Sequence, residues 1–196
     1  MKKFFITLFL LALAAPSFAL SGISIGIKGG LASYNDEVFT APEVEDNDMN
    51  LVGGQIKISS LPIINLVVSG EYMWKSESIG YGTERFDLDQ HDFALSATAL
   101  YPIKMKIISP FAGAGITNHN IGFDYSVPQS LSLEENGIVI PGSDNRLGYH
   151  LIGGVDVDIP AFPVSLTAEY RQNWIDTDYD TVKYYSISVG ANFKLP

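Results

Sequence analysis

Apolar and polar residues alternate along most of the chain after its first 20 positions, and helical periodicity is almost absent. In Ser165–Trp174, every second residue is Leu, Ala, Tyr, Gln or Trp, whereas the residues between them are Ser, Thr, Glu, Arg and Asn. Successive side chains of a β-strand point to opposite faces of the sheet. This segment therefore predicts a strand with one mostly apolar face and one polar face.

The same alternation predicts eight strands, each 11 to 13 residues long. They span Ser21–Ser33, Asn50–Ser60, Ile64–Lys75, Asp89–Tyr101, Ile107–Asn118, Leu147–Asp158, Val164–Trp174 and Lys183–Leu195. Strands of soluble proteins usually have about five or six residues. A tilted strand that crosses a bilayer needs about 9–11 residues, which the predicted lengths match much better.

The connections alternate in length as well. Short turns with Pro62, Pro102, Pro160 and Pro163 follow the even-numbered strands, and longer segments follow the odd-numbered ones. Proline suits such turns because its fixed φ and missing N–H do no harm there. Short turns on one side and long loops on the other are typical of outer-membrane barrels. We therefore expect an all-β fold, an eight-stranded antiparallel up-and-down transmembrane β-barrel.

The polar face of these strands is the one expected to point inward. It carries Ser, Thr, Gly and Asn with scattered single charges, rather than the Lys- and Glu-rich mixture of a water-exposed barrel exterior. In the fifth strand, either Phe111 or the set Ala112, Ala114 and Ile116 faces lipid, and the second choice is favoured. Aromatic residues of the apolar rows suit the two membrane interfaces. These residues are Tyr72, Trp74, Tyr101, Tyr170, Trp174, Tyr185 and Phe193.

Several ionisable residues fall on the inward rows. The lumen candidates are Glu71, Glu169, Arg171, Lys57 and Asp92. Because an isolated buried ion is very unfavourable, such groups must pair or stay hydrated. We expect Arg171 to pair with Glu71 or Glu169 as a structural strut, and an ion gate is the functional alternative.

The N-terminus has the layout of a secretory signal peptide. Two lysines precede an apolar run, Phe4–Ala15, and Ser17 and Ala19 form a small-x-small ending. The run of about twelve residues is shorter than the roughly 20 that a membrane-spanning helix needs. We expect a signal peptide at 1–19 and a barrel domain at 20–196, and an uncleaved anchor is the alternative.

The charge balance argues against nucleic acid as a partner. The formal net charge is −10, whereas nucleic-acid binding depends on clustered Lys and Arg. Acidic residues gather in the long loops: Asp36, Glu37, Glu45, Asp46, Asp48, Asp176, Asp178 and Asp180. The last three begin like a calcium loop, but Thr181 and Ile187 stand where its glycine and closing glutamate belong. We expect solvated loops, no metal site and no cofactor, with divalent-cation binding as the alternative.

An enzymatic role is not expected. A lipid A deacylase would place a serine two residues after a histidine on one strand face, where a base could reach the nucleophile. His91, His119 and His150 are instead followed at that offset by apolar residues.

Three strand sequences resemble those of a known family. Ser109–Ile116, Leu147–Ile159 and Ser165–Trp174 resemble strands five, six and seven of small bacterial outer-membrane barrels of the OmpA/OmpX type, also called porin-like. The resemblance covers the architecture of the whole chain after the leader and implies a cell-surface protein in the outer membrane of a Gram-negative bacterium.

The C-terminal segment VGANFKL is similar to the β-signal that the barrel-assembly machinery recognises in this family. Gly190, Phe193 and Leu195 fit the signal, whereas Pro196 stands where the family usually ends on an aromatic residue. The expected partners are therefore this machinery, outer-membrane lipid and lipopolysaccharide, and an extracellular ligand of the long loops.

These observations predict a structural or surface-interaction protein that serves envelope integrity, adhesion or surface shielding. A narrow pore, or a channel for small hydrophobic molecules, is the first alternative. It would require gaps among the lumen side chains. A lipid A-modifying enzyme is the weaker alternative.

Overall fold

The computed structural model describes residues 22–34, 48–81, 84–126, 144–176 and 181–195. The predicted signal peptide lies outside these residues. Eight strands follow one another along the chain: β1 Ile23–Tyr34, β2 Asp48–Ile58, β3 Asn65–Tyr81, β4 Glu84–Pro102, β5 Ile108–Ser126, β6 Asp144–Asp158, β7 Val164–Asp176 and β8 Thr181–Lys194. No helix within the described segments has the length and hydropathy needed to cross a membrane.

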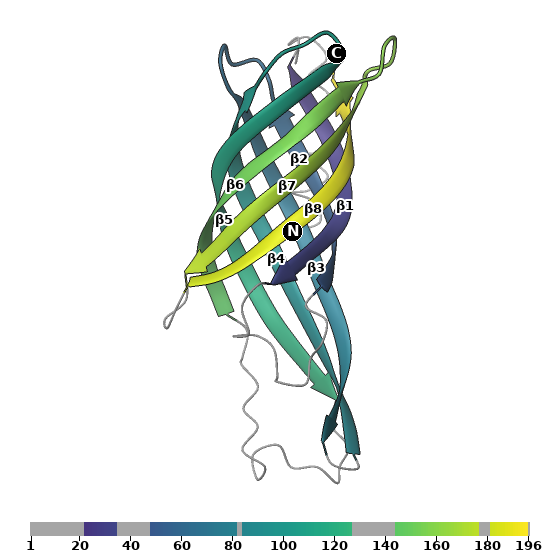
Figure 1. Cartoon of the computed structure of the whole chain (residues 1–196), viewed down its shortest axis with the longest axis vertical. Helices are drawn as coiled ribbons and strands as arrows, with labels where there is room; N and C mark the ends of the chain where they lie inside the picture. The colour runs from purple at the N-terminus through teal and green to yellow at the C-terminus, as the bar shows by residue number, and fades with distance from the viewer. Residues whose placement is uncertain (1–21, 35–47, 82–83, 127–143, 177–180, 196) are drawn as a thin grey trace, which may run out of the picture.

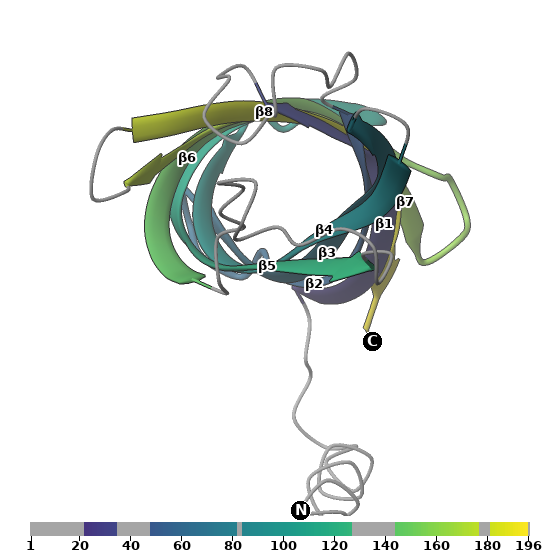
Figure 2. The same ribbon diagram turned by 90° about the horizontal axis from the view of Figure 1, so that it is seen from below.

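The strands close into a barrel, as the sequence predicted. Each strand pairs antiparallel with the next one in the chain, and β8 returns to pair with β1. In that closing pair, Ile25 lies opposite Phe193 and Tyr34 opposite Tyr184. Figure 2 shows the resulting ring of strands seen along the barrel. Closure leaves no free sheet edge within the barrel wall, which is the condition for a sheet that crosses hydrocarbon.

Three strands extend furthest beyond the bounds that the sequence pattern predicted. β3 reaches Tyr81, β4 begins at Glu84 and β5 continues to Ser126, so part of two expected loops is strand. Figure 1 shows these strands projecting beyond the other five at the end that carries the long connections. We call this projecting sheet the extension. Apolar residues need to alternate only where a strand meets lipid. Beyond the rim of the barrel the alternation ends, although the strands remain paired through backbone hydrogen bonds. The sequence pattern therefore did not reveal these parts of the strands.

The two faces of the strands are oriented as predicted. Ile27 and Val189 on the outer face are 72% and 65% exposed, whereas Asp92 on the inner face is fully buried. In β5, Phe111 points into the lumen and Ile116 is exposed on the outside, which confirms the favoured choice.

Apolar side chains fill two parts of the lumen. One cluster lies toward the long connections and consists of Ala32, Tyr34, Met49, Leu51, Met73, Ala94, Ile121, Ile175, Val182 and Tyr184. We call it the loop-side apolar layer. A smaller cluster lies toward the short turns and consists of Val67, Leu100, Phe111 and Ile152. An eight-stranded barrel is just wide enough for side chains to fill, and these clusters do so.

One short turn holds a residue in a left-handed conformation. Between β6 and β7, the Phe162 N–H donates to the Ile159 carbonyl at 3.2 Å. Ala161, the third residue of this turn, has a φ of 66°. Proline at the second position and a positive φ at the third are the features of a type II turn, which favours glycine at the third position.

Replacing this alanine tests the strain in the turn. Ala161→Gly should stabilise the folded barrel by about 0.5–1 kcal/mol, because glycine adopts a positive φ without the steric penalty of a Cβ. The measurement is the free energy of unfolding in detergent. Ala161→Val is the matched control and should destabilise the barrel; equal stability of all three proteins would contradict the argument.

Candidate functional site in the barrel lumen

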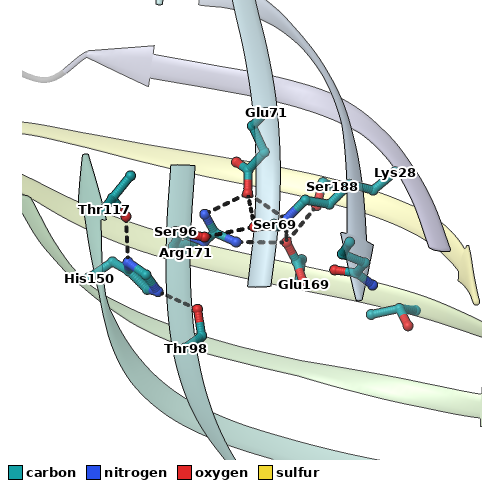
Figure 3. Close-up of polar contacts among 12 residues, drawn as sticks. Lys28, Ser69, Glu71, Ser96, Thr98, Thr117, His150, Glu169, Arg171 and Ser188 are labelled. Carbon is teal, nitrogen blue, oxygen red and sulfur yellow. Dashed lines mark hydrogen bonds and ion pairs between the residues drawn. The ribbon is translucent and has the colours of Figure 1, made fainter. Parts of the chain in front are cut away.

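Four charged side chains meet in the middle of the lumen. Lys28 comes from β1, Glu71 from β3, and Glu169 and Arg171 from β7. Arg171 Nη1 lies 2.8 Å from Glu71 Oε1, and Arg171 Nη2 lies 3.5 Å from Glu169 Oε1. Lys28 Nζ lies 2.8 Å from Glu71 and 2.7 Å from Glu169. Figure 3 shows the four groups converging, and we call them the charged layer.

The period of the strands explains why these side chains meet. Each of the four occupies an inward position of its strand, and outward side chains such as Ile27, Tyr72 and Tyr170 stand next to them in the sequence. The side chains of Lys28, Glu71 and Arg171 are only 2–3% exposed, so water cannot solvate their charges freely. Two positive and two negative groups compensate each other, which is the arrangement that buried charges require.

Hydroxyl groups complete the hydrogen bonding of the carboxylates. Ser69 Oγ donates to Glu71 Oε1 at 2.8 Å, and Ser188 Oγ donates to Glu169 Oε1 at 3.0 Å. Ser69 is also 2.7 Å from Ser96 on the neighbouring strand. Small hydroxyl residues on the inward rows therefore serve the charged layer as hydrogen-bond donors without filling the space it needs.

Glycine provides part of that space. A Cβ at Gly53 would lie 2.9 Å from Glu71 Cγ, and a Cβ at Gly190 would lie 3.0 Å from Lys28 Cβ. Gly190, which the sequence analysis predicted as part of the assembly signal, lies in the structure at a tightly packed position beside the charged layer.

The predicted lumen residue Lys57 belongs to a different group, nearer the short turns. Lys57 Nζ forms an ion pair with Asp156, whose other oxygen accepts a hydrogen bond from Thr167 at 2.6 Å. Thr167 Oγ1 in turn accepts a hydrogen bond from Asn192 at 2.8 Å, and Gln55 donates to Asn192 at 2.7 Å. This chain of contacts joins β2, β6, β7 and β8 on the short-turn side of the charged layer.

Asp92, also predicted in the lumen, pairs with a histidine rather than with a lysine or arginine. His119 Nδ1 lies 2.7 Å from Asp92 Oδ2, and both side chains are completely buried. His150 lies between two hydroxyls, with Nε2 at 2.9 Å from Thr98 and Nδ1 at 2.9 Å from Thr117. His119 thus links β5 to the neighbouring β4, and His150 links β6 both to the neighbouring β5 and to β4 beyond it.

Lys28 is the member of the charged layer that the sequence analysis missed. Its segment, GISIGIKGG (Gly22–Gly30), places Ser24, Gly26 and Lys28 on one face and Ile25 and Ile27 on the other. The same alternation that identified Arg171 would have placed this lysine inside. Its two contacts with carboxylates make it as central as Arg171.

The predicted aromatic residues lie on the outer face of the barrel. Tyr72 stacks on Trp74 with ring centroids 5.7 Å apart, and Tyr170 lies 6.1 Å from Tyr185. Trp174 stacks at 5.2 Å on Tyr149, which the sequence analysis did not include. At the short-turn end, Tyr101 and Phe193 are each 58% exposed.

Most of the predicted acidic loop residues lie outside the described residues, namely Asp36, Glu37, Glu45, Asp46, Asp178 and Asp180. Asp48 and Asp176 are described, and both are exposed at the loop ends of their strands. Within the described part of the chain, no three His, Asp or Glu residues are grouped closely enough to hold a metal ion. Of the predicted assembly signal, Phe193 is exposed and Leu195 half-buried, whereas Pro196 is not described.

The lumen opens into a cavity at its short-turn end. This cavity has a volume of about 290 Å³ and is lined by residues that include Lys57, Lys104 and Asp156. Beside the charged layer, between Arg171 and Phe111, a cavity of only about 10 Å³ is present. A space of that size holds about one water molecule. The opening therefore narrows sharply where it reaches the charged layer.

Solved structures with the same architecture come from several bacteria. Neisserial surface protein A aligns with a TM-score of 0.59 at 15% identity, over 89% of this chain and 98% of that one. OprG of Pseudomonas aeruginosa aligns with a TM-score of 0.56 at 12% identity, over 89% and 98%. Ail of Yersinia pestis, in complex with the heparin analogue sucrose octasulfate, gives 0.54 at 14% identity, over 89% and 97%. Because the sequence identities are this low, the structural matches establish a shared fold and nothing more specific.

No protein with a curated description matches the chain in sequence. The family model of the outer membrane protein beta-barrel domain, however, matches residues 5–194, nearly the whole sequence. Together with the closed barrel and its apolar exterior, this match shows that the chain belongs to the outer membrane protein β-barrel domain family.

Proposed function

We propose that this protein is a structural and surface-interaction barrel, in which a closed lumen forms a rigid membrane anchor for an extracellular surface. The observation that carries the proposal is the charged layer, whose four mutually compensated groups cross the lumen from β1, β3 and β7. Residues 1–19 act as the export signal in this proposal.

Two successive layers support a closed lumen. The charged layer leaves room for little more than one water molecule beside Arg171. Toward the long connections, the loop-side apolar layer includes Met49, Met73 and Tyr184, each no more than 1% exposed. Ions would have to pass both the charged layer, whose charges already compensate each other, and a buried apolar layer that offers them little solvation.

The extension supports a role in surface interactions. Register pairing of β2 with β3 ends at Trp74, and that of β5 with β6 ends at Ile121, whereas β3, β4 and β5 remain paired with one another beyond these points. In a barrel with periplasmic short turns, this sheet projects from the cell. Binding residues tend to lie on such projecting segments while the scaffold holds them in place.

The charge of the loop end restricts the class of ligand. The Ail structure contains a polyanionic heparin analogue. In this chain, Asp and Glu number 22 against 12 Lys and Arg, and the connection at 35–47 has acidic residues but no basic ones. We therefore expect a basic or neutral partner rather than a polyanion, because like charges repel at an interface.

A narrow pore is the rival function, and the cavity at the short-turn end favours it. That cavity of about 290 Å³ would be the mouth of a channel if the charged layer could part. Such a channel requires the Arg171–Glu71 contact to break and the loop-side apolar layer to open as well.

Conductance separates the two functions. In planar bilayers, the wild-type protein should give no discrete current steps, and Arg171→Ala should remain silent because the loop-side apolar layer still closes the lumen. Single-channel recording is the measurement. Regular steps from the wild-type protein that change size in Arg171→Ala would establish the pore instead.

The charged layer should stabilise the barrel as a unit. Arg171→Met should lower the free energy of unfolding by about 3–5 kcal/mol, because it leaves a buried carboxylate uncompensated. Adding Glu71→Gln should recover most of this loss, since Lys28 and Glu169 still pair at 2.7 Å. Denaturant unfolding in detergent measures both variants.

The control for that comparison is an exposed ion pair. Lys194 lies 2.7 Å from Asp158 at the rim, and both side chains are nearly half exposed. Lys194→Met should therefore change stability by less than about 1 kcal/mol. If Arg171→Met behaves like Lys194→Met, the charged layer is not a structural element.

Surface binding should depend on the long connections and not on the lumen. Replacing residues 35–47, the acidic connection, with a short Gly-Ser linker should leave folding intact, as judged by the slower gel migration on heating, and should abolish binding of expressing cells to a basic matrix protein. Arg171→Met supplies a control with altered lumen and unaltered surface. Undiminished binding after loop replacement would place the interaction elsewhere.

A further inference from the structure

The short turns of the barrel are unexpectedly apolar. Ile63 between β2 and β3 is 68% exposed, Met105 between β4 and β5 is 56% exposed, and Phe162 between β6 and β7 is 67% exposed. Each of the three turns thus carries at least one large apolar side chain at the end of the barrel that faces the periplasm. Turns surrounded by water would favour polar residues at these positions.

The apolar surface continues past the aromatic residues of this end. On β4, Tyr101 is 58% exposed, as expected of a residue at the membrane interface. Beyond it, Ile103 is 54% and Ile107 is 45% exposed. The outward apolar row therefore extends into the zone where lipid headgroups lie, rather than stopping at the interface.

Positive charge accompanies these side chains. Lys104 and Lys106 alternate with Ile103, Met105 and Ile107 in the turn between β4 and β5. Both lysines are exposed, with Lys104 and Met105 at the rim of the lumen cavity, and neither lysine has a carboxylate partner among the residues that the structure describes.

The acidic groups at the same end are already compensated. Asp156 is paired with Lys57, and Asp158 lies 2.7 Å from Lys194. The uncompensated charge on the described part of this rim is therefore positive, in a chain whose formal net charge is −10. A local excess of lysine against so acidic a background points to an anionic surface as the neighbour.

We propose that the three short turns insert into the headgroup region of the periplasmic leaflet and that Lys104 and Lys106 select anionic glycerophospholipids there. We call Ile63, Met105 and Phe162 with these two lysines the turn anchor. Apolar side chains interspersed with lysine are the combination that holds a protein segment in an anionic membrane interface, where each lysine adds attraction to the buried apolar area.

Depth measurements test the insertion. The chain contains no cysteine, so single cysteines at Ile63, Met105 and Phe162 can each carry a nitroxide label in the full-length barrel in lipid nanodiscs. Leu95→Cys supplies a reference inside the lipid and Asp176→Cys a reference in water. For each turn label, we expect the ratio of its collision rate with oxygen to its collision rate with a water-soluble nickel chelate to be several-fold higher than for the label at Asp176→Cys. Turn labels as accessible to nickel as that reference would overturn the proposal.

Lipid preference tests the role of the lysines. The association constant of the wild-type barrel for spin-labelled phosphatidylglycerol should exceed that for phosphatidylcholine, by about five-fold for each of the two lysines. Lys104→Gln/Lys106→Gln should abolish most of the preference at unchanged thermal stability, because both side chains are exposed. Lys75→Gln, at the opposite end, is the matched control and should retain the preference. No preference in the wild-type protein, or an equal preference in Lys104→Gln/Lys106→Gln, would overturn the selection of anionic lipid.

Discussion

The structure depends on one requirement, that every backbone N–H and C=O in hydrocarbon be paired within the protein. An open sheet cannot meet it, and the pairing of β8 with β1 does. With eight strands, the closed wall encloses a space that side chains must fill. Closure therefore also determines the chemistry of the interior, because any charge on an inward position has to find its counter-charge there.

The two-residue period of a strand couples the lipid surface to the lumen. A shift of one residue in any strand would place apolar side chains inside and the charges in lipid. Lys28 of β1 and Arg171 of β7 both contact Glu71 of β3, and these contacts require the strands to be in the register observed. A shift in register would therefore break the contacts of the charged layer inside the barrel as well as the apolar surface outside it.

The sequence was sufficient for the strand count, which follows from local alternation. It was also sufficient for the orientation of both faces and the inward position of Arg171 and Glu71, which follow from the composition of the polar rows. It did not reveal which inward residues share a height in the lumen. That property depends on the stagger accumulated around the closed sheet, so Asp92 meets His119 and Lys57 meets Asp156 without any signal in their spacing. The extension escaped prediction for a related reason, since strands outside lipid need no apolar row.

The two ends of the barrel are free to differ because the lumen separates them. The contacts of the charged layer and of the loop-side apolar layer lie within the wall, so residues beyond the wall are not constrained by them. At one end, this freedom permits a projecting sheet and, at the loop ends of β2 and β7, the exposed acidic residues Asp48 and Asp176. At the other, it permits short turns with exposed apolar and basic residues. A rigid interior thus allows two chemically opposed surfaces to be carried by a single sheet.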